Sequence, residues 1–537
     1  MAFNLADFVE HTVDAVPDRT ALICGAREAT FAQLEDRSNR LAHHLADQGV
    51  GPGDHVAVYS YNCLEFVETM LASFKLRAVP INVNFRYVED ELIYLLDNSD
   101  SVVLVHQAQF TPLVENVRDH LPLLRHVITV DDDSGTALAA GAVAYEDALA
   151  GASPTRDFGP RTDDDIYILY TGGTTGYPKG VVWRHEDVWR VLGGGIDFLT
   201  GVRIEDEFEM SRLAAETEPG VGLVLAPLMH GAAQWGTLGG LIKGTTSVLL
   251  PQFSGHAVWE AVERYKIATI AITGDAMAIP LIDALREKTY DTSSLVAIAS
   301  TAAVFSPVVK DQLFELLPNL FISEAVGSSE SGFNGMRLVE KGNTSMAGGG
   351  LINVSRGPDT IVIDESNQPV EPGQIGRMAR GGNVPLEYYK DPEKSAATFI
   401  TVDGKRYSVP GDSARLELDG TMTLLGRGSQ CINSGGEKIY PEEVESALKG
   451  HPKVFDALVV GVSDDRWGQR VAAVVEPRPG EAPTLEELVE HCRTKLAGYK
   501  VPRQLHLVTE MPRHPSGKPD YRRAKAVAEN DAEEAHA

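Results

Sequence analysis

A stretch rich in glycine and threonine that ends in a lysine carries the clearest chemistry in this sequence. Thr171, Gly172, Gly173, Thr174 and Thr175 are followed by Lys179, and the apolar run at 166–169 precedes them. Glycines let backbone N–H groups approach an anion closely, threonines add hydroxyl donors, and lysine adds a mobile cation. We therefore expect a buried strand that leads into a polyphosphate-binding loop.

Two other interpretations of this stretch are less favourable. The P-loop of the nucleoside triphosphatases needs a glycine before its lysine and a serine or threonine after it, but Pro178 and Gly180 stand at these positions. A flexible Gly/Thr linker seldom follows a buried strand and has no need of a fixed lysine. A polyphosphate-binding loop therefore remains the favoured interpretation of this stretch.

Five further motifs follow this loop along the chain. They lie at 226–231 (Ala-Pro-Leu-Met-His-Gly), 327–330 (Gly-Ser-Ser-Glu), 409–412 (Val-Pro-Gly-Asp), 426–438 (beginning Gly-Arg-Gly-Ser-Gln) and 512–518 (Pro-Arg-His-Pro-Ser-Gly-Lys). In content and order, the six motifs resemble the signatures of the adenylate-forming (ANL) superfamily: acyl-CoA synthetases, luciferases and peptide-synthetase adenylation domains. The sequence at 183–187 and 388–392 is most similar to bacterial fatty-acid and steroid-acid CoA ligases. The resemblance covers essentially the whole chain.

The resemblance implies an acyl-CoA ligase that converts a hydrophobic carboxylic acid (fatty, steroid or terpenoid type) to its CoA thioester through acyl-AMP. ATP, Mg²⁺ and CoA are the implied cofactors. A carboxylate oxygen must attack the α-phosphorus of ATP, so two anions have to meet, and the site has to supply positive charge and a metal. No general base is needed if a CoA thiolate attacks an adenylate whose leaving group is AMP.

The resemblance also assigns charged residues to these roles. Lys518 would bridge the substrate carboxylate and the α-phosphate, and Glu330 would hold Mg²⁺ as a hard oxygen ligand. Asp412 would accept hydrogen bonds from the ribose hydroxyls, and Arg427 would reach the ribose or the phosphate. The alternatives are a solvated surface lysine, an exposed loop carboxylate and an interdomain ion pair.

The remaining site residues follow from the same motifs. His230 is grouped with Lys518 as a catalytic candidate, but we expect it to line the acyl pocket and not to act as a base; packing in the core is the alternative. Trp235 and Gly231 are expected to border that pocket. Nucleotide contacts are further expected from the next motif, at Gly327, Ser328 and Ser329. The pantetheine channel is expected to be lined by Asn433, Gly435, Gly436 and Glu437.

Short β-branched runs alternate with amphipathic stretches, which is typical of α/β layers with mainly parallel sheets. We expect strands at 55–60, 102–105, 126–130, 166–171, 222–226, 267–273 and 295–300, and helices at 65–76, 258–265 and 308–316. Pro441 and Gly450 suit the two ends of a helix at 442–449, and Thr484 with Glu487 forms a capping-box pattern. The acidic, alanine-rich residues 526–537 are expected to fray.

The resemblance divides the chain into a large N-terminal α/β domain, residues 1–429, and a small C-terminal α+β domain, residues 430–537. Gln430 stands at the implied hinge, where the family usually has Asp or Lys. The small domain is expected to rotate between the half-reactions. One orientation presents Lys518 for adenylation, and the other presents the pantetheine channel.

Three residues depart from the family pattern at the expected adenine pocket. Val326 replaces the usual aromatic residue, and Thr301 and Ala302 replace glycines of the pocket wall. Base–aromatic stacking is worth roughly 1–3 kcal/mol in nucleic-acid sites, so its loss would weaken ATP binding. Glu387 also adds negative charge where glycine is usual.

These departures leave three hypotheses. The first is a complete ATP-dependent acyl-CoA ligase. The second is a ligase with weak or absent adenylation that takes acyl-AMP made by a partner ligase. The third is a non-catalytic acyl- or nucleotide-binding relative, which the retained Lys518, Glu330, Asp412 and Arg427 disfavour.

The composition limits which partner molecules and which cellular compartment we expect. The net charge of −28 over 537 residues argues against nucleic acid or an anionic membrane as a partner. The expected partners are a small carboxylic acid and CoA; a homodimer stays open. No apolar run reaches the roughly 18 residues of a membrane-spanning helix. The four scattered cysteines and the lack of a signal sequence favour the cytoplasm.

Overall fold

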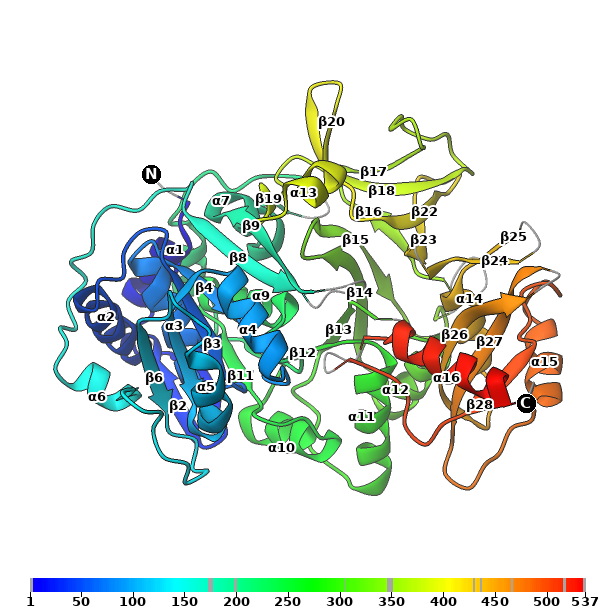
Figure 1. Cartoon of the computed structure of the whole chain (residues 1–537), viewed down its shortest axis with the longest axis horizontal. Coiled ribbons are helices and arrows are strands. Elements are labelled where there is room, and N and C mark those ends of the chain that lie inside the picture. Colours follow the sequence, from blue (N-terminus) through cyan, green and yellow to red (C-terminus); the bar gives the residue numbers. More distant parts are fainter. Residues whose placement is uncertain are drawn as a thin grey trace. The chain divides into compact units, whose positions relative to one another are not determined.

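The chain is an α/β protein that divides into two compact units (Figure 1). The computed structural model describes residues 3–171, 177–197, 200–303, 305–344, 351–427, 430–434, 437–464, 467–514 and 518–534, without the side chains of 427, 438 and 530–534. The first unit comprises residues 1–271, 290–295 and 383–399. The second comprises residues 272–289, 296–382 and 400–537.

A five-stranded parallel sheet forms one layer of the first unit, in the order β4-β3-β5-β6-β7. Its strands are β3 (His55–Tyr59), β4 (Val79–Asn82), β5 (Ser101–Gln107), β6 (His126–Val130) and β7 (Val143–Ala144). Every residue of β3, β5 and β6 is buried, as expected for a parallel sheet covered on both faces. One face packs against α4 (Glu89–Asn98) and α5 (Thr111–Arg118), and the other against α2 (Phe31–Asp47), α3 (Leu64–Lys75) and α6 (Tyr145–Ala150).

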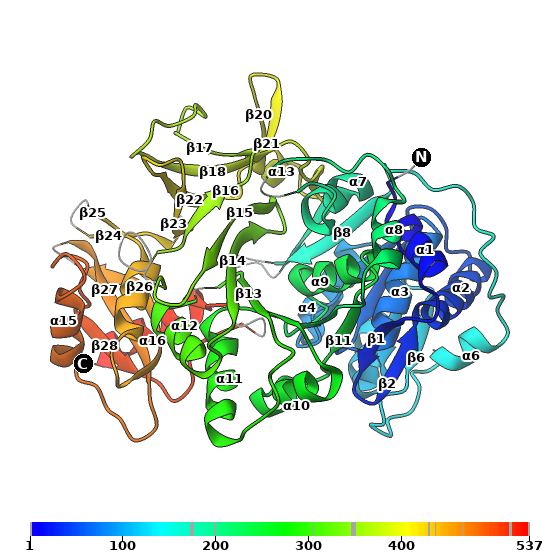
Figure 2. The same cartoon turned by 180° about the vertical axis from the view of Figure 1, so that it is seen from behind.

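A second layer of the first unit runs in the order β2-β1-β11-β10-β12 and is parallel apart from the β1–β2 pair. These strands are β1 (Thr20–Cys24), β2 (Arg27–Thr30), β10 (Val221–Val224), β11 (Thr246–Leu249) and β12 (Thr269–Ile272). Figure 2 shows this side of the molecule. The helices here are α1 (Leu5–Ala15), α7 (His185–Val188), α8 (Glu209–Glu216), α9 (Gly231–Ile242) and α10 (Gly255–Tyr265).

An antiparallel three-stranded sheet, β19-β9-β8, completes the first unit. It consists of β8 (Ile166–Thr171), β9 (Lys179–Arg184) and β19 (Glu387–Tyr388), and α13 (Pro392–Thr398) follows β19. The last residue of β8, Thr171, pairs with the first residue of β9, Lys179. The two ends of the predicted polyphosphate loop therefore lie side by side.

The larger sheet of the second unit runs in the order β13-β14-β15-β16-β23-β22-β18-β21-β20, with β17 on β18. Its strands are β13 (Ala297–Thr301), β14 (Phe321–Ser328), β15 (Gly332–Val339), β16 (Asn353–Arg356), β17 (Thr360–Ile363), β18 (Ile375–Gly381), β20 (Phe399–Val402), β21 (Lys405–Ser408), β22 (Asp412–Leu416) and β23 (Met422–Arg427). Only the β13–β14 pair is parallel among the described pairs. Two helices belong to this part, α11 (Asp275–Glu287) and α12 (Pro307–Leu316).

A separate sheet follows residue 430 in the same unit, in the order β25-β24-β27-β26 with β28 on β27. Its elements are β24 (Ile432–Ser434), β25 (Glu437–Ile439), α14 (Pro441–Lys449), β26 (Val454–Asp464), β27 (Gly468–Pro477), α15 (Leu485–Arg493), β28 (Gln504–Leu507) and α16 (Tyr521–Glu534). Alternate residues of β26 and β27 pack on α14 and α15 on one face and on α16 on the other. This small α+β layer is the predicted C-terminal architecture.

Most predicted elements are present with bounds shifted by a few residues. The strands at 126–130 and 166–171 are confirmed at both ends, as is the capping box of Thr484 and Glu487. The prediction of fraying from residue 526 is wrong as far as Glu534, because α16 continues there. Ala524 and Ala528 bury their methyl groups against β26 and β27, and this packing stabilises the helix on the sheet. The domain boundary at Gln430 stays a prediction.

Candidate active site

The polyphosphate loop is framed by a β-hairpin of the first unit. Thr171 and Lys179 are cross-strand partners at the open end of β8 and β9. Gly172, Gly173, Thr174 and Thr175 lie outside the described residues. Beyond the loop, the ring of Tyr177 stacks on that of Tyr94 at a centroid distance of 4.2 Å. The hairpin base is thus a fixed frame for whatever the loop binds.

Lys179 pairs with a carboxylate 212 residues away in the sequence, a contact that the sequence analysis did not predict. Its ammonium group pairs with Asp391 and lies 5.8 Å from the centre of the Tyr388 ring. Asp391 also caps α13, because its side chain accepts a hydrogen bond from the backbone of Lys394. The hydrogen bond from Lys179 lowers the pKa of Asp391, so this partner is an anion. Phosphate binding by Lys179 would have to compete with it.

Three buried amide side chains fix the segment that leads to His230, and sequence reasoning missed them. Asn82 accepts a hydrogen bond from the backbone N–H of Tyr170 and donates to the carbonyls of Tyr170 and Met229. Asn62 accepts from the N–H of Leu228. Gln234 donates to the carbonyl of Leu228 and accepts from the hydroxyl of Tyr167. A polar residue at the end of an apolar run, as at Asn82, is the only sequence signal.

His230 is the residue that precedes α9, and its extended backbone starts the helix. Its carbonyl accepts hydrogen bonds from Ala233 and Gln234 in the first turn. Gly231 leaves no open volume, because an added Cβ would meet Leu169 of β8 at 2.3 Å. Trp235 is buried with its ring edge-on to Tyr167 at 5.6 Å. Helix α9 therefore packs closely on β8 at the residues expected to border the acyl pocket.

In the second unit, Gly327 and Ser328 end β14, and Ser329 and Glu330 begin the turn that leads to β15. A Cβ at Gly327 would meet the carbonyl oxygen of Gly332 at 2.6 Å, so only glycine allows this close backbone approach. The hydroxyls of Ser328 and Ser331 lie 2.8 Å apart and close the turn. Glu330 lies in this turn and is half-buried. The turn thus presents the predicted metal ligand on a rigid hairpin.

The predicted ribose residues meet across two strands of the same unit. Asp412 at the start of β22 pairs with Arg427 at the end of β23. Gly411 precedes them with a φ of +102°, which favours glycine. The hydroxyl of Ser408 donates to the carbonyl of Glu330, with a distance of 2.5 Å. This bond ties the Glu330 turn to the strand that leads to Asp412.

The three departures at the expected adenine wall have distinct environments. Val326 is buried in a hydrophobic cluster with Val354, Met378 and Met422, so its side chain is part of the sheet core. Thr301 is half-buried at the end of β13 and pairs with Ala325. Ala302 is exposed and has a φ of +68°, in the left-handed region. The backbone at Ala302 therefore keeps a conformation that suits glycine although the residue is alanine.

The residues assigned to the second half-reaction lie on the C-terminal sheet. Asn433 is exposed on β24, and its N–H donates to Gln469 at 2.8 Å. Glu437 is exposed at the start of β25, whereas Gly435 and Gly436 lie outside the described residues. Gln430 lines a small hollow of about 80 Å³. Lys518, which is assigned to the first half-reaction, is exposed, and its carbonyl accepts a hydrogen bond from the N–H of His514 at 2.8 Å.

The donor set of the second unit fits a nucleotide with a metal ion. No group of three or more His, Cys, Asp or Glu side chains gathers as a metal site within the described ranges. Glu330 would therefore hold Mg²⁺ together with phosphate oxygens and water, as Mg²⁺ commonly binds with one or two carboxylates. The hydroxyl groups of the Ser328 turn and the carboxylate of Asp412 are of the right type for phosphate and ribose.

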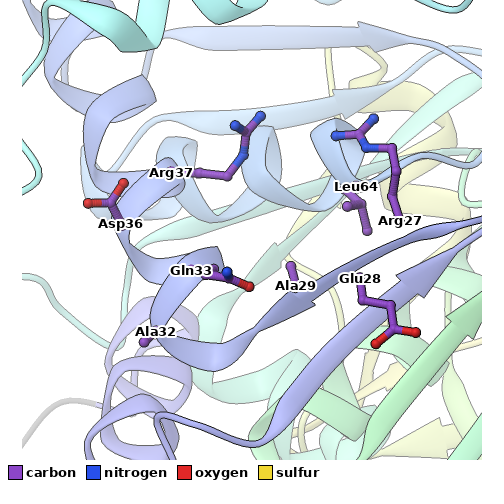
Figure 3. A pocket seen from close by; sticks show the side chains of 8 residues that line it. All are labelled: Arg27, Glu28, Ala29, Ala32, Gln33, Asp36, Arg37 and Leu64. Carbon is purple, nitrogen blue, oxygen red and sulfur yellow. The ribbon is translucent and has the colours of Figure 1, made fainter.

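A hollow of about 630 Å³ lies apart from all these motifs, beside β2 and α2 of the first unit (Figure 3). The guanidinium groups of Arg27 and Arg37 lie along one side of it. Arg27 is paired with Glu65 at 2.5 Å, and Arg37 with Glu68 at 2.7 Å. Because both cations already hold carboxylates, the hollow offers little attraction to an anionic substrate.

Comparison with known proteins identifies related sequences along the whole chain. The model of the AMP-binding enzyme family matches residues 9–389, and that of the AMP-binding enzyme C-terminal domain matches residues 443–518. The chain is 54% identical over 534 residues to a 3-oxocholest-4-en-26-oate–CoA ligase of Rhodococcus rhodochrous, covering 98% of this chain and 96% of that protein. It is 53% identical to a medium/long-chain-fatty-acid–CoA/3-oxocholest-4-en-26-oate–CoA ligase of Mycobacterium marinum, covering 100% of this chain and 99% of the other.

The fold has close counterparts among solved structures. The anthranilate CoA ligase AuaEII in complex with anthranoyl-AMP matches with a TM-score of 0.85 at 24% identity, covering 98% of both chains. At this identity the match supports the fold alone. No helix in the described part of the chain combines the length and apolarity needed to cross a membrane.

Proposed function

This chain belongs to the AMP-binding enzyme family, and we propose that it joins a bulky apolar carboxylic acid to CoA through an acyl-AMP intermediate. It is an acyl-CoA ligase, and as such it uses ATP and CoA. The observation that carries this assignment is the 54% identity to a CoA ligase over nearly the full length of both proteins. The retained Lys518, Glu330 and Asp412 agree with it.

The proposed acid is of the steroid side-chain or medium- to long-chain fatty type. Both relatives described above, at 54% and 53% identity, are named for 3-oxocholest-4-en-26-oate, and the second is also named for medium- and long-chain fatty acids. Leu228, Met229 and Trp235, which lie close to His230 in the sequence, are buried apolar residues. Such neighbours favour an apolar acyl group.

In the first half-reaction, an acid oxygen forms a bond to the α-phosphorus of ATP while the bond to pyrophosphate breaks. Mg²⁺, held by Glu330, would neutralise the departing phosphates. Lys518 would lie between the carboxylate and the α-phosphate, and the Thr171–Lys179 hairpin would carry the loop for the other phosphates. In the second half-reaction, the CoA sulfur bonds to the acyl carbon and AMP leaves. Asn433 and Glu437 would flank the pantetheine arm.

The residues at the adenine wall favour a second candidate, a ligase that adenylates poorly and consumes acyl-AMP from a partner ligase. Thr301 and Ala302 add side chains to the expected wall, and Val326, whose side chain packs in the sheet core, supplies no aromatic ring that could stack on the base. The binding of acyl-AMP would be weakened less than the binding of ATP, because the acyl group adds apolar contacts. The complete ligase remains the main proposal, since the charged residues are retained.

The test is to supply the purified enzyme with Mg²⁺, CoA and each of a panel of acids, with either ATP or the matching synthetic acyl-AMP. A 3-oxosteroid acid, octanoate, palmitate and benzoate make a suitable panel. Thioester from ATP and the apolar acids supports the complete ligase. Thioester from acyl-AMP alone supports the split reaction, and no thioester from any combination contradicts both.

A further inference from the structure

A chain of buried charges links α11 to the loop that carries Lys518. Asp275 is the first residue of α11, and the ammonium group of Lys449, at the end of α14, lies 3.8 Å from its Oδ2. Lys449 also lies 3.1 Å from Asp456 of β26. Side-chain exposure is 5% for Lys449, 2% for Asp275 and 7% for Asp456, so all three are withdrawn from water.

The same Asp456 holds the base of the Lys518 loop. Arg513 donates two hydrogen bonds to it, with distances of 2.6 and 2.9 Å. One residue further on, His514 donates its N–H to the carbonyl of Lys518, and Asp520 donates its N–H to that of Pro512. Burial alone would raise the pKa of Asp456, but Lys449 and Arg513 outweigh burial and lower it to about 2. Asp456 is therefore an anion held between two cations.

At its other end, the chain of charges reaches the expected adenine wall. Oδ1 of Asp275 accepts a hydrogen bond of 2.8 Å from the N–H of Ser306. The neighbouring Gly274 donates its N–H to the hydroxyl of Ser300, at 3.2 Å. Asp275 is thus fixed by the two ends of the 300–306 segment, which includes Thr301 and Ala302. All these residues belong to the second unit.

The two links differ in strength. Arg513 and Asp456 form a two-point hydrogen-bonded pair within the C-terminal segment, defined here as residues 430–537. By contrast, Oδ2 of Asp275 accepts no hydrogen bond from any residue in the described ranges, and Lys449 approaches it only to ion-pair distance. The Lys449–Asp275 link is therefore the weaker of the two, and it is the one that joins the C-terminal segment to α11.

The pantetheine residues lie at the opposite end of β26 from this cluster. Asp456 stands near the start of the strand, whereas Asp464 at its end pairs with Gly468, which also pairs with Ser434 of β24. Eight residues of strand span about 26 Å. One orientation of the C-terminal segment thus cannot bring both the Lys518 loop and the β24–β25 hairpin to the same place.

We propose that Lys449 is a positioning residue for adenylation, and that its ion pair with Asp275 latches the C-terminal segment in the orientation in which Lys518 serves the α-phosphate. This proposal rests on the proposed function, because it assigns the latch to one of the two half-reactions. The latch opens before CoA is used, while Asp456 keeps Arg513 throughout. Release is feasible because Lys449 retains Asp456 as its partner when Asp275 moves away.

The test measures the two half-reactions separately in Asp275→Asn and Lys449→Met. Asparagine keeps the shape of Asp275 and the acceptor for the N–H of Ser306 but removes the charge that attracts Lys449. We expect ATP–pyrophosphate exchange to fall at least tenfold in both variants, whereas thioester formation from preformed acyl-AMP stays within twofold of wild type. A residue with a merely structural role would lower both half-reactions together.

Lys500→Met is the matched control. Lys500 pairs with Glu443 at 2.6 Å, and both residues lie within the C-terminal segment, so removal of this pair should leave both half-reactions near wild type. A rate of ATP–pyrophosphate exchange within twofold of wild type in Asp275→Asn, or equal loss of both half-reactions, would overturn the latch. Failure of Asp275→Asn to fold would overturn it as well, because a contact that opens in each cycle cannot be required for folding.

A readout without activity separates the latch from the ligase assignment. In Asp275→Asn, hydrogen exchange followed by mass spectrometry should be faster at the end of α14 and at 300–306, and Lys500→Met should not change these segments. If the wild type catalyses neither half-reaction, the ligase assignment fails, and this exchange pattern still decides whether the latch exists. Unchanged exchange at both segments would contradict the latch.

Discussion

The side-chain amide of Asn82 donates a hydrogen bond of 2.6 Å to the carbonyl of Met229. The same side chain pairs with both backbone groups of Tyr170, one residue before Thr171 and the polyphosphate loop. One buried residue therefore sets the distance between the strand that leads to the phosphate loop and the segment that leads to His230.

Asn82→Ala should destabilise the protein by about 3 kcal/mol, because three buried hydrogen bonds at about 1 kcal/mol each lose their partner. Adenylation should fall more steeply than stability explains, since Tyr170 and Met229 are no longer held together. Urea unfolding and ATP–pyrophosphate exchange measure the two effects. Asn84→Ala is the control: within the described part of the chain, the side chain of Asn84 accepts one hydrogen bond, from the nearby N–H of Arg86. Equal losses of stability and of adenylation in Asn82→Ala and Asn84→Ala would contradict this role of Asn82.

Asp391→Asn should tighten ATP binding, because Lys179 no longer has to leave an anionic partner. The pair is partly exposed, with side-chain exposure of 35% for Lys179 and 29% for Asp391, so its worth is about 0–1 kcal/mol. The dissociation constant for ATP should fall by up to about fivefold. Asparagine also caps helices well, so α13 should persist.

Isothermal titration calorimetry at low and high salt measures this change, which should shrink as salt screens the pair. Lys179→Met in the same assay should weaken ATP binding, because the cation itself is lost. Weaker ATP binding in Asp391→Asn would show that the carboxylate helps the nucleotide site and does not compete with it.

Ala302→Gly should raise the free energy of unfolding by about 0.5–1 kcal/mol. A residue with a Cβ is strained at a φ of +68°, and this strain exceeds the extra flexibility that glycine gives the unfolded chain. Removal of the methyl group from the expected adenine wall should also tighten ATP binding. Thermal unfolding and calorimetry test both effects. Ala303→Gly is the neighbouring control and should be neutral or destabilising, because Ala303 is not among the residues with positive φ.

Glu442 should make the protein less stable as the pH rises. Burial, followed by the charges of Glu445 and Asp412, raises its pKa to about 8, well above the usual value of 4.5. Between these pH values the folded chain binds more protons than the unfolded chain, so stability is full below about pH 4.5 and is lost as the pH passes 8. Oε2 of Glu442 accepts no hydrogen bond within the described part of the chain.

Thermal unfolding of wild type and Glu442→Gln at pH 6 and pH 9 tests this prediction. The variant should lose less stability than wild type on going from pH 6 to pH 9. A parallel decline in the two proteins would assign the pH dependence to other groups, such as Glu445, whose pKa burial also raises.

The sequence predicted best what depends on local pattern. The runs 126–130 and 166–171 are short, apolar and bounded by polar residues, so both strands have the predicted ends. The capping box of Thr484 and Glu487 is likewise a local pattern, and it is present as predicted. The charged motif residues keep their family positions, although their roles remain proposals.

Contacts between distant parts of the chain were not predictable in this way. Lys179 and Asp391 are 212 residues apart, and nothing near either residue indicates the other. Val326 has the same residue type whether it borders a nucleotide or fills a core, and only its packing with Val354 and Met422 shows the second role. Residues 526–534 resemble a frayed end until the contacts of Ala528 with the C-terminal sheet are known.

The most direct test of the account is the behaviour of Lys518→Ala in the two half-reactions, with a 3-oxosteroid acid or a long-chain fatty acid as substrate. We predict that the wild type catalyses ATP–pyrophosphate exchange and that the variant loses it by at least about a hundredfold, as expected when a charge that stabilises the transition state is removed. The variant should still convert preformed acyl-AMP and CoA to thioester within about threefold of the wild-type rate, because Lys518 serves only the first half-reaction. Equal loss of both half-reactions, or undiminished exchange, would contradict the assignment of Lys518 to adenylation.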